Sequence, residues 1–163
     1  MVTKTIRHIG AVACVTGLLA GCAFDEGVKS AATAPQLQEA SGPPQLKLPL
    51  ANGGERWFYT TAPAGTQTWR VDIAANGAVT AREQVLTDDR FQAIRSGLTE
   101  ADIRMSIGPP FRTVRFERTK TTAWDYFYRD TYGYYAFFSV IFTDDGIVSS
   151  KFLQRREPSD NNK

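Results

Sequence analysis

The pattern of apolar and polar positions is clearest between residues 97 and 148, where a helical period gives way to an alternating one. Thr99 can cap the first turn of a helix, and Asp102 supplies the second half of a shortened capping box. Gly108 and the two prolines after it end that helix, because glycine suits a C-terminal cap and proline interrupts helical hydrogen bonding. The pattern therefore predicts a short helix over residues 99–108.

Alternating side chains follow this helix and predict an antiparallel meander. The predicted strands are residues 111–118, 123–129, 134–143 and 147–153. A Thr-Asp-Asp-Gly sequence at residues 143–146 predicts a tight turn between the last two strands. Before the first helix, Thr87 and the two aspartates after it can cap another short helix that ends near Gly97.

One face of the predicted sheet has an expected cover within the chain, and the other does not. Trp124, Tyr126 and Tyr128 share one face, which we expect to pack under the helices. The opposite face still carries four apolar or aromatic side chains, Phe127, Tyr135, Phe137 and Ile141. An antiparallel sheet with one solvated face normally alternates more cleanly. Either another part of the chain covers these four residues or a partner does, and they are the candidate partner surface.

An upstream segment repeats this arrangement at an offset of about 66 residues. The matched landmarks are Gly-Pro-Pro at 42–44 and 108–110, aromatic segments at 57–59 and 124–126, and glycine turns at 76–79 and 145–148. The first copy is degenerate, with a helix of about two turns that has Pro35 near its start and Leu37 as its main apolar anchor. We predict an α+β fold of two repeats, residues 33–86 and 87–155, with short helices packed on antiparallel meanders.

The N-terminal residues read as a targeting segment. Two basic residues precede an apolar run over residues 9–20, which is too short for a transmembrane helix and typical of a signal peptide over residues 1–21. The Leu-Ala-Gly-Cys sequence ending at Cys22 resembles the lipobox of bacterial lipoproteins. That resemblance implies cleavage before Cys22 and lipidation of its thiol and new amino group. An ordinary signal peptide with an incidental cysteine is the alternative.

The residue after the lipobox indicates the membrane to which the protein is sent, and two segments outside the repeats are predicted to lack a fold. Ala23 stands where an aspartate would mark retention in the inner membrane of enteric bacteria, so the resemblance implies the periplasmic side of the outer membrane. Small and polar side chains over residues 22–32 predict a lipidated tether, and residues 156–163 read as a disordered tail.

Composition narrows the functions that a mature chain can have. Removing residues 1–21 leaves 142 residues with 17 basic and 17 acidic side chains, and this balance argues against nucleic-acid binding. The segment also removes the single histidine, His8, together with Cys14. The remaining residues include no histidine and one cysteine, Cys22. This excludes His/Cys metal sites, histidine-dependent nucleophiles and intrachain disulfides. The paired acids at 88–89 and 144–145 are better explained by helix capping and a turn than by glycoside hydrolysis. We expect no enzyme activity, cofactor, metal or small-molecule substrate.

The second repeat resembles a known lipoprotein family. Its motifs are Gly-Leu-Thr-x-x-Asp-Ile from residue 97, Ile-Gly-Pro-Pro from 107, Trp-Asp-Tyr from 124 and Val-Ile-Phe-x-Asp-Asp-Gly-Ile-Val from 140. They resemble the BamE (SmpA/OmlA) family of outer-membrane lipoproteins, which assist β-barrel assembly. Family members have one such unit, and two units in tandem resemble β-lactamase inhibitor proteins. Both resemblances imply a protein-binding module.

The expected function is therefore that of a lipid-anchored protein-interaction module, in outer-membrane barrel assembly or envelope integrity. The membrane contact would be made through Cys22, and the partner would be a protein of the envelope. The alternative is an inhibitor or ligand-binding periplasmic lipoprotein of the β-lactamase-inhibitor type. A third possibility is a structural protein held to peptidoglycan.

Overall fold

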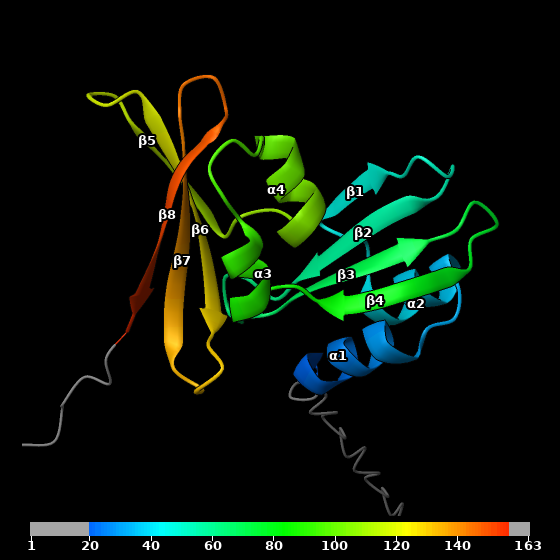
Figure 1. Ribbon diagram of the computed structural model, residues 1–163. Coiled ribbons are helices and arrows are strands. Elements are labelled where there is room, and N and C mark those ends of the chain that lie inside the picture. Colours follow the sequence, from blue (N-terminus) through cyan, green and yellow to red (C-terminus); the bar gives the residue numbers. More distant parts are fainter. Residues whose placement is uncertain (1–19, 157–163) are drawn as a thin grey trace, which may run out of the picture.

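The computed structural model describes residues 20–156, in which two helices followed by four strands occur twice (Figure 1). The first unit contains α1 (Ala20–Ser30), α2 (Ala34–Ser41), β1 (Leu46–Pro49), β2 (Glu55–Thr60), β3 (Thr68–Ile73) and β4 (Val79–Gln84). The second contains α3 (Asp88–Ala93), α4 (Glu100–Ile107), β5 (Arg112–Phe116), β6 (Thr121–Arg129), β7 (Tyr135–Phe142) and β8 (Val148–Arg155). Each set of strands is an antiparallel meander in sequence order, so the fold is α+β as predicted. No helix within residues 20–156 is long and apolar enough to cross a membrane.

The two units share local details as well as element order. An isolated bridge joins Thr33 to Ala78 in the first unit, and Thr99 to Ile147 makes the same connection in the second. In each unit this bridge ties the start of the second helix to the turn between the last two strands. The third strand of each sheet also carries a register shift near its end, between residues 72 and 73 and between residues 141 and 142.

Local capping explains where the helices of the second unit begin. Thr99 accepts a hydrogen bond from the Asp102 N–H, and the Asp102 carboxylate accepts one from the Thr99 N–H, which together form the predicted capping box. Thr87 caps α3 by accepting from the Arg90 N–H. The observed strand β5 ends two residues earlier than predicted, at Phe116, because the chain turns between Glu117 and Lys120.

Helix α4 lies between the two sheets, while α1 and α2 cover the far face of the first sheet (Figure 1). The larger core contains Ile103 and Ile107 of α4 and the inner side chains of β6 and β7. Phe58 of β2 belongs to the same core and has no exposed surface, although it comes from the first unit. The Arg56 guanidinium donates to the Met105 carbonyl of α4 over 3.0 Å. The two units therefore share one packed interface, with α4 in the middle.

The prediction of a tether over residues 22–32 is wrong. These residues form most of α1, so the first unit has two helices rather than the one that was predicted. Val28 is fully buried and lies in the core of the first sheet with Leu37 and Val71. The sequence around Val28 is mostly small, polar or charged, which is why the segment was interpreted as a tether. The predicted signal peptide lies outside the described residues up to residue 19, as does the predicted tail from residue 157 onward.

The burial of α1 leads to a stability prediction. Val28→Ala is expected to lower the free energy of unfolding by about 2 kcal/mol, because it removes two buried methyl-sized groups. Glu26→Ala, an exposed change on the same helix, is the matched control and should shift stability by less than about 0.5 kcal/mol. Urea denaturation of both variants would measure the difference. Equal, negligible effects would mean that the segment behaves as the tether that the sequence suggested.

Candidate functional site

The four residues of the predicted partner surface lie together on the outer face of the second sheet. In the observed register, Phe127 lies opposite Phe137. The Phe127 ring is 5.5 Å from that of Tyr135 and 5.0 Å from that of Phe137, measured between centroids. Tyr135 is 45% exposed, whereas Phe127, Phe137 and Ile141 are half-buried. Strand alternation alone was enough to bring these side chains onto one face.

Further aromatic residues extend this face beyond the four that alternation along β6 and β7 indicated. Phe111 precedes β5, and its ring lies 6.3 Å from that of Phe137. Phe152 of β8 is paired with Ser139 in the register, which places it on the outer side, and it is 51% exposed. The outer aromatic face is defined here as Phe111, Phe127, Tyr135, Phe137, Ile141 and Phe152. Alternation within β8 would have indicated Phe152, had the strand been aligned with β7.

A buried ionic group lies within the outer aromatic face. Asp125 is only 5% exposed and accepts hydrogen bonds from the Ser139 hydroxyl at 2.6 Å and the Arg112 Nη2 at 2.6 Å. The register places Arg112 and Ser139 on either side of Asp125. The Arg112 side chain is 58% exposed, so it balances the buried carboxylate while its guanidinium remains accessible to a partner.

The first unit does not cover the outer aromatic face. It contacts the second unit through α4, on the opposite side of the second sheet, where Phe58 joins the shared core (Figure 1). The inner residues Trp124, Tyr126 and Tyr128 are buried there beneath α3 and α4, as predicted. The internal-packing alternative for the outer residues is therefore not the arrangement that this fold adopts.

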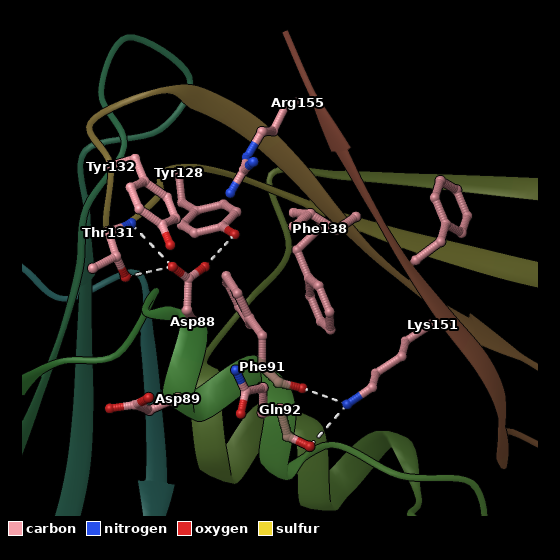
Figure 2. Close-up of a pocket in the computed structure, with 12 residues that line it drawn as sticks. Asp88, Asp89, Phe91, Gln92, Tyr128, Thr131, Tyr132, Phe138, Lys151 and Arg155 are labelled. Carbon is pink, nitrogen blue, oxygen red and sulfur yellow. Dashed lines mark hydrogen bonds between the residues drawn. The ribbon is translucent and has the colours of Figure 1, made fainter.

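A second candidate site is a cavity of about 500 Å³ between α3 and β8 (Figure 2). Phe91 and Phe138 stack with their ring centroids 4.0 Å apart at its apolar centre, next to Leu153. Lys151 lies at one side and donates to the carbonyls of Phe91 and Gln92 at the end of α3, both over 2.8 Å. We call this cavity the α3–β8 groove.

On the acidic side of the α3–β8 groove, three donors hold the carboxylate of Asp88. Asp88 accepts from the Tyr128 hydroxyl at 2.6 Å and from the Thr131 N–H at 2.9 Å, and also from the Thr131 hydroxyl (Figure 2). Burial opposes ionisation of Asp88, but these donors outweigh it and hold the pKa of its carboxyl below the ordinary value. Burial, together with the neighbouring Asp88 carboxylate, raises the pKa of Tyr128. Asp88 thus acts as an ionised anchor for the β6–β7 turn.

The chain resembles known proteins only weakly. No protein-family model matches the chain, and no curated protein matches it. A candidate β-lactamase inhibitor protein from Streptococcus mutans is 11% identical, covering 76% of this chain and 82% of that one, with a TM-score of 0.32. A DUF4309 family protein from Bacillus subtilis is 13% identical, covering 85% of this chain and 96% of that one, with a TM-score of 0.28. Likenesses this weak carry no argument about function, so the BamE and inhibitor resemblances stay interpretations of the sequence.

Proposed function

We propose that this chain is a non-catalytic protein-binding module that contacts its partner through the outer aromatic face. The observation that carries the proposal is the exposed cluster of aromatic side chains around the Arg112–Asp125 ion pair. Aromatic residues and arginine are the residue types that most often dominate binding energy at protein interfaces. Large apolar side chains gathered on one face of a sheet are also more typical of an interaction site than of a solvated surface.

The composition of the outer aromatic face favours a protein partner over a small ligand. Most of its aromatic rings spread over β6 and β7 rather than lining a concavity, which suits a broad contact. Each half-exposed aromatic side chain offers roughly 1 to 2 kcal/mol when a partner completes its burial. Excluding water from the Arg112–Asp125 pair would strengthen its electrostatics and select a partner with a matching acceptor.

We further propose that lipidated Cys22 anchors the module to the periplasmic side of the outer membrane. Helix α1 includes residue 22, and the buried Val28 lies only six residues later. Six helical residues span roughly 9 Å, so an anchored first unit would lie close to the lipid surface. An assembly role at a membrane β-barrel complex fits that placement. Inhibition of a soluble periplasmic enzyme by the same face is the alternative partner class.

A pull-down of the tagged chain from outer membranes in mild detergent would test the proposed face. Phe137→Glu should abolish recovery of the bound partner, because it places a charge at the centre of the aromatic cluster. Ala75→Glu adds the same charge at an exposed position in the turn between β3 and β4 and should leave recovery unchanged. Both variants would first be checked for native stability by thermal unfolding.

The identity of the recovered partner separates the two classes. A membrane barrel-assembly complex that is lost only with Phe137→Glu supports the assembly role, and a soluble enzyme lost in the same way supports the inhibitor role. A partner that binds wild type and Phe137→Glu equally would remove the outer aromatic face from the proposal. Recovery of peptidoglycan alone would contradict protein binding altogether.

A further inference from the structure

Strand β8 forms one edge of the second sheet, and most of its free side is unpaired. The strand order places β7 on its inner side only. At its start, the Val148 N–H donates to the Leu98 carbonyl at 2.7 Å, and its carbonyl accepts from the Gly97 N–H at 3.0 Å. Beyond Val148, no residue within 20–156 hydrogen bonds to the backbone on that side of β8. A free edge of this length is a template for another extended strand.

The register shows which backbone groups are available. The Arg156 N–H donates to the Tyr135 carbonyl over 2.8 Å, which makes these two residues a hydrogen-bonded pair. In an antiparallel ladder such pairs recur at every second residue, so Gln154 and Phe152 also direct their backbone groups toward β7. The alternate residues of β8 must then direct their N–H and C=O groups away from β7. These residues are Lys151, Leu153 and Arg155.

The side chains of these three residues face the α3–β8 groove, which runs beside the free edge (Figure 2). Leu153 is 47% exposed and lies near the stacked rings of Phe91 and Phe138, so the middle of the groove is apolar. Helix α3 packs on the inner faces of β6 and β7 through Phe91 and reaches β8 at Lys151, while Leu153 between them stays 47% exposed. An added strand would therefore project alternate side chains into an existing cavity.

Charge determines which side chains would fit at either end of the groove. Lys151 uses two of its three N–H groups on the α3 carbonyls, and the third remains available beside the edge. At the other end, Arg155 is already paired with the buried Asp130 through Nε at 2.6 Å, and Asp88 lies close by. A carboxylate is thus favoured opposite Lys151 and disfavoured opposite Arg155.

We infer that the free edge of β8 binds an extended segment of a partner protein by antiparallel strand addition. The segment carries an apolar residue opposite Leu153 and an acidic residue two positions later, opposite Lys151. Main-chain hydrogen bonds supply affinity, and the two side-chain positions supply specificity. Phe152 of the outer aromatic face also borders the groove, but strand addition uses the backbone edge and the inner side chains of β8, so it does not depend on that face.

A second copy of the chain is a poorer occupant. Antiparallel pairing of two β8 strands about Leu153 would place Lys151 of one copy opposite Arg155 of the other. Like charges directly opposite one another in a ladder are destabilising. The groove would also receive a basic residue at the end where Lys151 already lies. Charge complementarity therefore favours a heterologous acidic segment.

Fluorescence polarisation with short labelled peptides would test this inference, using the full chain with Cys22→Ser so that it cannot be lipidated. The probe is an eight-residue threonine-rich peptide with one leucine and an aspartate two positions after it. Replacing that aspartate by lysine should weaken binding by about fivefold or more. Lys151→Glu should reverse this preference, an effect that a general loss of stability would not produce.

Backbone methylation of the peptide tests strand addition without altering the protein. Methylating the leucine nitrogen should weaken binding by about tenfold or more, because that N–H faces β8. Methylating the threonine between leucine and aspartate should leave binding nearly unchanged, since its N–H faces away. Equal effects of the two methyl groups, no effect of Lys151→Glu, or no binding of any peptide would overturn the inference. A dimer in sedimentation analysis that the probe cannot dissociate would overturn it in favour of a second copy.

Discussion

Phe58→Ala is expected to lower the free energy of unfolding by about 3 to 5 kcal/mol, the usual cost of deleting a fully buried phenylalanine. Phe58 comes from β2 of the first unit but has no exposed surface and lies in the core of the second. Its ring contacts the end of α4 at Gly108. The substitution would leave a cavity between the two units, where the backbone on both sides is held by strands and by α4.

Urea denaturation followed by tryptophan fluorescence would measure this effect. Leu48→Ala is a suitable comparison, because Leu48 is only partly buried against the same core and should cost less. A loss of less than about 1 kcal/mol for Phe58→Ala would mean that the two units do not depend on this contact. They would then behave as independently stable modules, contrary to the shared core.

The local features of the second unit were predictable because they depend on neighbouring residues. Thr99 and Asp102 make the capping box from three positions apart, and the end of α4 at Gly108 follows from local backbone chemistry. Alternation along β6 and β7 likewise indicated the shared face of Phe127 and Phe137, because strand side chains alternate strictly. These predictions needed no knowledge of the tertiary structure.

The packing between the units was not predictable from the same patterns. Residues 57–59 are three consecutive aromatics, so they carry no period that assigns a face. The structure buries Trp57 and Tyr59 under α1 and α2 and Phe58 against α4, as in a strand covered on both sides. A strand of this kind reads as a continuous apolar run whichever element covers it.

The two candidate sites also combine features that local sequence predicts with features that depend on tertiary contacts. Four outer residues followed from alternation, but the Arg112–Asp125–Ser139 group depends on the register of three strands. The α3–β8 groove depends on contacts that are distant in sequence, since Asp88 is held by Thr131 and Lys151 reaches the end of α3. The interpretation of Asp88 as a helix cap was partly wrong, because Thr87 supplies the cap and Asp88 binds the β6–β7 turn.

The paired glycines at the ends of α2 and α4 permit a second large prediction with an internal control. Gly42 has φ of 76° and ψ of −170°, and Gly108 has φ of 80° and ψ of −164°. This backbone conformation is essentially restricted to glycine, so alanine at either position costs about 1 to 3 kcal/mol. A Cβ at Gly42 would meet nothing within 4 Å, whereas one at Gly108 would lie 2.6 Å from Cδ1 of Phe58.

Gly108→Ala should therefore destabilise the protein by about 1 to 3 kcal/mol more than Gly42→Ala, the added cost of overpacking a filled core. Because the backbone penalty is shared, the difference between the two variants isolates the contact between α4 and the first sheet. Combining Gly108→Ala with Phe58→Ala should remove much of that difference, since the clashing ring is gone. Equal losses for the two glycine variants in urea denaturation, or strict additivity in the double variant, would show that Phe58 does not press against Gly108 in solution.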